Sequence, residues 1–183
     1  MKKTIFSLVF ISLLCIGCKK EQNPFQIGKQ HVGLLTDSTQ VKDLKAVFAN
    51  DSVVSRLLDN EFTFNRTDID VFDKSGNKLL TLTPKTVQDS TSTIETIKVL
   101  DSRFKTEKGI STKSTFGDIE THYKISSIQN TLKNIVVFVN DINAFFTISK
   151  SELPAELQFD TNAKIEAVQI PEKAKIKYFM IGW

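Results

Sequence analysis

Cysteine is almost absent from this chain. Its two cysteines, Cys15 and Cys18, both lie near the amino terminus, and none follows in the body of the protein. That body therefore has no disulfide, no thiolate metal site and no cysteine nucleophile. A chain without disulfides has to be stabilised by burying apolar side chains, and its fourteen phenylalanines are well suited to that role.

Histidine, glycine and runs of basic residues are scarce as well. Neither His31 nor His122 stands in a spacing typical of metal ligands, and the seven glycines form no phosphate-binding or dinucleotide loop. The sequence also has no Gly-x-Ser-x-Gly elbow and no basic run typical of a nucleic-acid surface. We therefore expect a protein that is not an enzyme, carries no metal or other cofactor and binds no nucleic acid. One alternative stays open, because two carboxylates distant in sequence can still meet in a hydrolase cleft.

The first eighteen residues resemble an export signal. A basic start is followed by an apolar run over residues 5–16, which is too short for a membrane-spanning helix of about 20 residues. Gly17 and Cys18 end the run, and a cysteine directly after a small residue resembles the signal of bacterial lipoproteins. Cys15 departs from that pattern, because it occupies the position where these signals usually carry leucine.

The lipoprotein resemblance implies an anchor and a location. In that family the signal is cleaved before the cysteine, here Cys18, and both the thiol and the new amino terminus are acylated. The resemblance thus implies a protein held on the membrane by N-terminal lipid, in the outer membrane and facing the periplasm or the cell surface. An ordinary cleaved signal without lipid is the alternative. Residues 1–17 would be the signal, and residues 18–28 a short tether.

The chain beyond the tether contains an internal repeat. Residues 69–82 align without a gap with residues 135–148, and each segment has the pattern of two apolar strands joined by a polar turn. Gly76 suits the first turn, because glycine adopts a positive φ at no steric cost. A third strand is expected at residues 94–99 and, in the second copy, at residues 165–170. The identical residues, numbered in the first segment, are Ile69, Val71, Phe72, Asn77 and Thr81.

A short helix is expected before each set of strands. Apolar residues at 41, 44 and 48, and again at 116, 119 and 123, are spaced by three and four positions, which is typical of an amphipathic helix. Thr115 and Asp118 fit a capping box for the second helix, and Asp37 or Ser38 is expected to cap the first.

Three further segments have weaker patterns. Short strands are expected to lead into the helices, around residues 26–35 and 104–110. Residues 57–64 are expected to form a helical turn and then an edge strand. Residues 175–183 are expected to add an extra strand at the end of the chain.

Together these elements predict an α+β fold, built as a tandem duplication of a helix plus a three- to four-stranded antiparallel sheet. The first copy would span residues 29–106 and the second residues 107–183. Asp70 makes one face of a strand polar in the first copy, whereas Val136 takes its place in the second. The second sheet is therefore apolar on both faces, and we expect it to be packed on both sides. The alternative is that its second face is a binding surface.

This order of elements resembles the β-lactamase inhibitor protein fold and the small outer-membrane lipoproteins of the SmpA/OmlA type. Those families enter the helix through a Gly-Met-[Ser/Thr] stretch followed by an acidic and an aliphatic residue. Only the later part of that pattern is present here, as Asp43-Leu44 and Asp118-Ile119, and the disulfides of the inhibitor family are absent. The resemblance implies a protein-binding module and leaves its partner open.

Aromatic residues near the carboxyl terminus form the candidate binding surface. Adjacent residues on a strand point to opposite faces, so Phe145 and Phe146 cannot both enter one core. On the last strand, Tyr178 and Met180 are expected on the face of Ile176, opposite to Phe179 and Trp183. The alternative is that the helices or the other copy cover the rings. The candidates are Phe145, Phe146, Tyr178, Phe179 and Trp183.

The function expected from these features is a non-enzymatic protein-interaction module of the cell envelope, of inhibitor, immunity or assembly type. It would contact the membrane through its lipid and bind a protein partner. The alternative is a lipoprotein that binds a small ligand or glycan in a cleft between the two copies, which requires a concave apolar pocket with a few polar groups.

Overall fold

The computed structural model describes residues 23–58 and 66–183. The expected signal, the expected lipid site Cys18 and the first part of the tether lie outside the described residues. Most of segment 57–64, with its expected helical turn and edge strand, lies outside them too. In the described part, no helix is long and apolar enough to cross a membrane.

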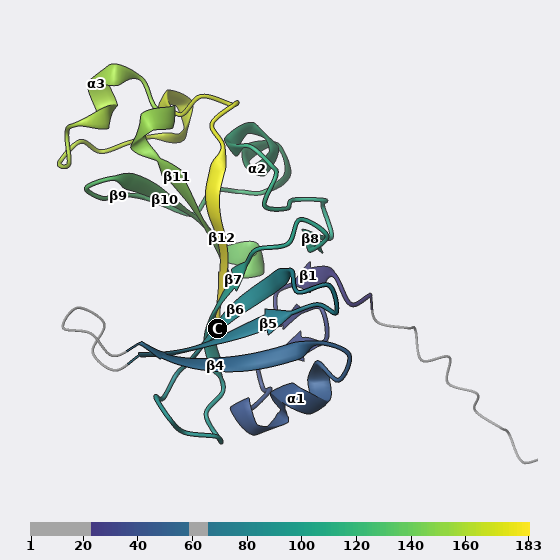
Figure 1. Ribbon diagram of the computed structural model, residues 1–183. Helices are drawn as coiled ribbons and strands as arrows, with labels where there is room; N and C mark the ends of the chain where they lie inside the picture. Colours follow the sequence, from purple (N-terminus) through teal and green to yellow (C-terminus); the bar gives the residue numbers. More distant parts are fainter. Residues whose placement is uncertain (1–22, 59–65) are drawn as a thin grey trace, which may run out of the picture.

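Within the described residues, eight antiparallel strands form one large sheet (Figure 1). Its strand order is β4-β5-β6-β7-β12-β11-β10-β9, so that β7 and β12 pair at the centre. The protein is thus a mixed α+β fold that is mostly strand. The strands are β4 (Ser52–Leu58), β5 (Arg66–Phe72), β6 (Lys78–Pro84), β7 (Ile94–Val99), β9 (Ser127–Asn130), β10 (Asn134–Val139), β11 (Ala144–Ser149) and β12 (Ile176–Gly182).

A second, smaller sheet joins the beginning of the described chain to its middle. Its order is β3-β2-β1-β8, with β1 parallel to β8. Ile27 in β1 is fully buried, so the folded body begins inside the segment that the sequence assigned to the tether. The strands are β1 (Gln26–Gly28), β2 (His31–Val32), β3 (Leu35–Thr36) and β8 (Lys105–Thr106).

The helices of residues 23–58 and 66–183 are few and short. Two of them lie where the spacing of apolar residues predicts: the 3₁₀ turn η1 (Val41–Asp43) continues into α1 (Leu44–Val47), and α2 covers Phe116–His122. The others are η2 (Asn140–Ile142), η3 (Lys150–Glu152), α3 (Ala155–Gln158) and η4 (Ala167–Gln169).

The capping prediction is confirmed for the second helix and wrong for the first. The Thr115 N–H donates to the Asp118 carboxylate at 2.8 Å, and the Asp118 N–H donates to the Thr115 hydroxyl at 3.4 Å. At η1 the N-cap is Gln40, and its side chain makes no capping hydrogen bond. The reason is that the first helix begins later than expected, after a turn in which the hydroxyls of Thr36 and Thr39 bond to each other.

One face of the large sheet is buried in the core. Figure 1 shows α1, α2 and the small sheet on the same side of it. Leu44 of α1, Phe116 of α2 and Val32 of β2 all belong to a single buried apolar cluster with the inner face. A row of directly paired residues crosses that face: Val71, Leu80, Val99, Phe179, Phe146 and Val137.

The two repeated hairpins form as predicted. β5 with β6, and β10 with β11, are the antiparallel pairs expected from the aligned segments. Gly76 in the first turn has a φ of 81°, as its position predicted, and Asn143 adopts a φ of 52° in the second. The expected strand at residues 94–99 is β7.

The third strand predicted for the second copy is wrong. Residues 165–170 contain η4, where the Gln169 N–H donates to the Glu166 carbonyl at 3.0 Å. Pro171 directly follows and cannot donate to a strand ladder, while Ile165 and Ile170 bury their side chains from the loop. β12 pairs with β11 instead, so the strand expected as an addition is central to the sheet.

The face assignment on β12 also needs a correction at its start. The pairing register with β11 shifts between Thr147 and Ile148, so that Lys177 is an extra residue in β12. Ile176 therefore turns into the core, away from the face of Tyr178.

Candidate functional site

The outer face of the large sheet is not covered by either helix of the core. A second row of directly paired side chains runs across it. This row is polar over β5–β7 and apolar over β10–β12, and we call the whole surface the open face. The row consists of Val54, Asp70, Thr81, Lys98, Met180, Phe145, Phe138 and Ser127.

The polar half of the open face is organised by Asp70. Its buried carboxylate accepts hydrogen bonds from Lys78 at 2.8 Å and Thr81 at 2.7 Å, and it lies 3.2 Å from the Arg56 guanidinium. Burial alone would raise the pKa of Asp70, but the hydrogen bonds from Lys78 and Thr81 and the nearby positive charges outweigh it. The pKa therefore lies below its ordinary value, and the carboxylate is ionised at neutral pH.

A second acid repeats this arrangement two residues earlier on β5. Asp68 is buried, accepts a hydrogen bond from Arg66 at 2.9 Å and another from Thr83 at 2.9 Å. Arg66 itself is half exposed and also donates to Thr83. The two acids thus hold their cations at the surface, where the positive groups face solvent while the carboxylates do not.

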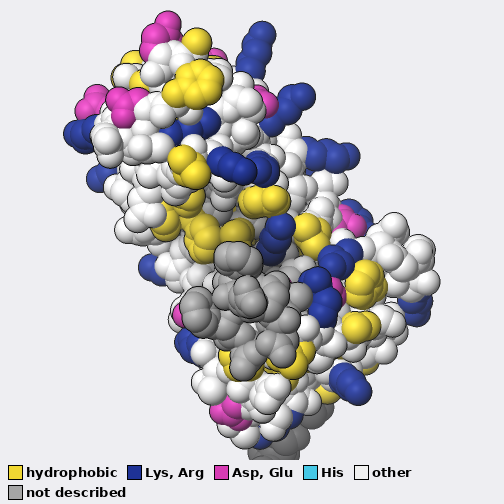
Figure 2. All heavy atoms as spheres, turned by 60° about the vertical axis from the view of Figure 1, so that its left-hand side comes forward, with side chains coloured by type: hydrophobic (Ala, Val, Ile, Leu, Met, Phe, Trp, Pro, Cys, Tyr) yellow, Lys and Arg dark blue, Asp and Glu magenta, His cyan; other side chains and the backbone are white. Residues whose placement is uncertain are grey.

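The apolar half contains two stacked phenylalanines and a tyrosine. The Phe138 and Phe145 rings are nearly parallel, with centroids 5.9 Å apart. Tyr178 is 37% exposed, and the Lys98 ammonium lies 3.7 Å from the centre of its ring. Figure 2 looks toward this side of the molecule and shows basic side chains next to hydrophobic ones.

A cavity of about 480 Å³ lies where the two halves of the open face meet. Arg56, Arg66 and Lys98 line it from β4–β7, and Tyr178 and Met180 line it from β12. Its wall is therefore mixed, with cationic groups on one side and an aromatic ring on the other. Such a surface fits an anionic group attached to an apolar or aromatic one.

The five predicted aromatic residues do not form one surface. Phe146 and Phe179 are fully buried, with ring centroids 4.7 Å apart, and must be removed from the candidate surface. Trp183 lies elsewhere, because its indole N–H donates to the Lys29 carbonyl at 3.2 Å. Phe145 and Tyr178 remain on the open face.

The expected burial of the second sheet on both sides needs a similar correction. Val139 belongs to the core face, whereas Val136 lies on the open face and is only half buried. Neighbouring side chains such as Phe138 and Thr147 shield this face in part.

The basic and acidic members of the open face had no part in the sequence-based site. Asp68 and Asp70 alternate with apolar residues along β5, and Thr81 and Thr83 do the same along β6. This alternation was the signal in the sequence from which these side chains could have been placed on one face of the sheet. Their meeting with Arg56 and Lys98 depends on strand register, which the sequence does not show.

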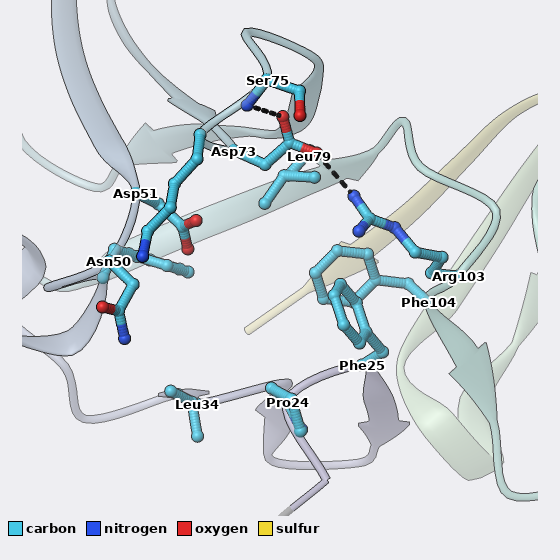
Figure 3. A pocket seen from close by; sticks show the side chains of 12 residues that line it. Pro24, Phe25, Leu34, Asn50, Asp51, Asp73, Ser75, Leu79, Arg103 and Phe104 are labelled. Atoms are coloured by element: carbon cyan, nitrogen blue, oxygen red, sulfur yellow. Dashed lines mark hydrogen bonds and ion pairs between the residues drawn. The ribbon is translucent and has the colours of Figure 1, made fainter.

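A second cavity, of about 310 Å³, lies next to the small sheet (Figure 3). Its floor is apolar and includes Phe25, Phe104 and Leu79. Figure 3 shows Asn50 and Asp51 on the opposite side of this space. The residues that line it lie between Pro24 and Phe104, so none belongs to the expected second copy. It is therefore not the cleft between two copies that the alternative function requires.

Arg103 closes one side of this second cavity. It donates to Asp73 at 2.9 Å and to Asp101 at 2.8 Å, and its guanidinium lies 4.7 Å from the centre of the Phe25 ring. The hydrogen bond from the Asn77 N–H lowers the pKa of Asp73 most, and the one from Arg103 lowers the pKa of Asp101 most. Both acids are therefore held ionised at neutral pH.

Histidines and acids do not gather into a metal site in the described part of the chain. His31 lies in the small sheet, and His122 ends α2 with its Nδ1 2.8 Å from the Asp118 carbonyl oxygen. The two histidines thus lie in different elements, and the His122 ring bonds within its own helix.

No protein-family model and no curated protein matches this sequence. Among solved structures, the fold is similar to the uncharacterized protein yfeY from Escherichia coli, with a TM-score of 0.57 and 16% sequence identity. The match covers 86% of this chain and 99% of that one. At this identity the likeness concerns the fold alone.

Proposed function

We propose that this chain is a lipid-anchored protein of the cell envelope whose folded body binds another protein through the open face, without catalysing a reaction. The observation that carries the proposal is the combination of the exposed Tyr178 and Arg56 with the half-buried Lys98 around one cavity. Aromatic and arginine side chains are enriched where proteins bind each other. The buried Asp70 carboxylate holds Arg56, and the Tyr178 ring holds Lys98, in place before a partner arrives.

The anchor in this proposal rests on the sequence. The pattern ending in Gly17-Cys18 supports acylation of Cys18 and a place in the outer membrane. Only six residues separate Cys18 from Phe25. An extended chain of that length spans roughly 20 Å, so the body would stay next to the membrane.

The proposal also includes a tandem duplication. In the large sheet, both sets of strands follow the chain from an edge to the centre. β4 to β7 lead inward from one edge, β9 to β12 lead inward from the other, and β7 and β12 pair in the middle. α1 precedes the first set and α2 precedes the second. Two copies of a helix-plus-sheet unit, over residues 29–106 and 107–183, account for both this order and the repeated hairpin sequence. Because of this arrangement, we also propose that the fold resembles those of the β-lactamase inhibitor protein and of the SmpA/OmlA lipoproteins.

A photocrosslinking experiment tests the interaction. A photoreactive phenylalanine analogue replaces Tyr178 in the full-length, membrane-bound protein, and the matched control carries it at Val168, which is 87% exposed but lies in η4. We expect a discrete protein adduct from the first position and none from the second. Loss of the adduct in Lys98→Glu, with unchanged folding by circular dichroism, would support the open face. No adduct at Tyr178, or the same adduct at both positions, contradicts the proposal.

A second candidate function is binding of a small ligand or glycan. It is favoured by the 480 Å³ cavity, which includes residues of both proposed copies, Thr96 of β7 and Met180 of β12 among them. Native mass spectrometry of protein purified from its own membrane separates the two candidates. A retained small molecule that Met180→Trp excludes would favour the ligand, and a chain without one would favour the protein partner.

A further inference from the structure

The two edge strands of the large sheet differ in whether another segment is bonded to them. At one edge, β9 has four residues, and its Asn130 side chain donates to the carbonyls of Asp160 and Ala163. The loop before η4 is thus tied to that edge. At the other edge, β4 has seven residues and pairs with β5 alone, without a bulge. Among the described residues, no other strand or loop makes backbone hydrogen bonds to β4.

The sequence of β4 does little to protect this edge. It contains no proline, and Arg56 is its one charged residue. Val54 is 50% exposed and Leu57 49% exposed, although both are apolar. Edge strands usually avoid unwanted pairing through bulges, prolines or several charges, and β4 has none of these protections. Such an edge is a ready template for another strand.

An apolar groove lies beside β4 on the core side of the large sheet, opposite to the open face. It has a volume of about 350 Å³, and its apolar lining consists of Val41, Leu57, Ile69 and Pro84, next to polar residues that include Asp89. The hydroxyl of Thr67, which also lines it, is buried and has no hydrogen-bond partner among the described residues. Buried hydroxyls are nearly always paired, so a water molecule or a polar group of a segment bound in the groove would satisfy this one.

Side chains on the two faces of β4 have different chemistry. Ser55 and Leu57 face the groove, whereas Val54 and Arg56 face the open side. On the open side, the acids near Arg56 are buried and already bonded to their own cations, so the exposed charge there is positive. A strand placed beside β4 would therefore have its residues next to cations on one face and next to an apolar groove on the other.

We propose that β4 accepts an extended segment of the protein partner as an additional strand, and that this segment alternates acidic and apolar residues. The acidic residues lie next to Arg56 and Arg66, and an apolar residue enters the groove beside Leu57. Main-chain hydrogen bonds hold the segment, and the groove and the cations select its sequence. This inference rests on the proposed function and names the chemistry of the partner.

A second copy of this chain fits the edge less well. Pairing of β4 with itself would bring the Arg56 and Arg66 groups of two copies onto one face, where like charges repel. An acidic segment meets no such repulsion, because its carboxylates lie next to Arg56 and Arg66 of a single chain.

The test uses synthetic peptides and the complete folded protein. The probe is a fluorescein-labelled ten-residue peptide in which glutamate alternates with valine or leucine. A scrambled peptide of the same composition, and one with lysine in place of glutamate, are the controls. We expect the alternating acidic peptide to bind at least tenfold more tightly than either control by fluorescence anisotropy. Hydrogen exchange of the β4 amides should slow when it binds.

Two variants make the result specific. Arg56→Glu and Leu57→Lys should each weaken binding of the acidic peptide about tenfold or more, whereas Val168→Lys, far along the chain in η4, should leave it unchanged. Equal binding of all peptides, unchanged exchange in β4 or unaffected variants would overturn the inference. Adducts from Tyr178 in the crosslinking experiment would still support the proposed function in that case, so the two failures are distinguishable. Analytical ultracentrifugation tests the other occupant. A dimer that Leu57→Lys abolishes would show that β4 pairs with a second copy of this chain, and would overturn the inference.

Discussion

The Lys98 ammonium lies 3.7 Å from the centre of the Tyr178 ring, across the central pair of strands β7 and β12. This contact joins the polar half of the open face to the aromatic half. A second cation, Lys177, is farther from the same ring, at 5.4 Å. The pair of lysines therefore provides a matched comparison of a close and a distant contact with one aromatic side chain.

Replacing these lysines should affect stability unequally. Lys98→Ala is expected to lower the free energy of unfolding by about 0.5–1 kcal/mol, because a partly exposed cation–π contact is worth that much. Lys177→Ala should change it by less. Urea denaturation followed by circular dichroism measures both. Equal effects of the two substitutions would mean that distance to the Tyr178 ring does not matter.

Adjacent phenylalanines on β11 should differ strongly when shortened. Phe146→Ala removes a fully buried ring from the core and should cost about 3–5 kcal/mol of stability. Phe145→Ala should cost clearly less, since its ring lies half buried on the open face. Thermal and chemical denaturation provide the comparison. Similar losses for the two variants would contradict the assignment of these residues to opposite faces.

Acid should destabilise the protein through Asp70. Because its pKa is lower in the folded chain than the ordinary 3.8, the ionised group stabilises the fold fully at pH well above 3.8. That contribution is lost as the pH falls below 3.8 and through the folded value. We expect unfolding free energies measured from pH 6 to pH 2.5 to fall more gently in Asp70→Asn than in the parent protein. A parallel pair of curves would show that the carboxylate has no such linkage.

The capping box of α2 should contribute measurably to stability. Thr115→Ala removes the hydroxyl that accepts from the Asp118 N–H and should cost about 1 kcal/mol. Thr121 lies exposed within the same helix, and Thr121→Ala should be neutral or slightly stabilising because alanine favours helix. A Thr115 variant as stable as the Thr121 variant would indicate that the cap contributes nothing.

Local patterns in the sequence predicted the repeated hairpins and the second helix. The alternation along residues 69–82 and 135–148 specifies strands, Gly76 specifies a turn, and Thr115 with Asp118 specifies a helix start. These features depend on neighbours in the chain. They could be predicted because each one is a local physical preference.

The large sheet and its open face could not be predicted in the same way. Residues 165–170 alternate like a strand, yet β12 takes the position beside β11, because pairing depends on contacts between distant segments. The cluster of Asp70, Lys78 and Arg56 requires the register of three strands. The sequence showed that Phe145 and Phe146 point in opposite directions, but not which of them faces the core.

The pairing of β1 with both β2 and β8 has a mechanical consequence. β1 begins at Gln26, shortly after the expected attachment point, and its Ile27 is fully buried. Tension from a membrane anchor would pass directly into this strand and from there, through β8, to the midpoint of the chain. If the chain is anchored in this way, a pull on the anchor acts first on the β1–β2 and β1–β8 pairs, and releasing β1 would expose the buried side chain of Ile27.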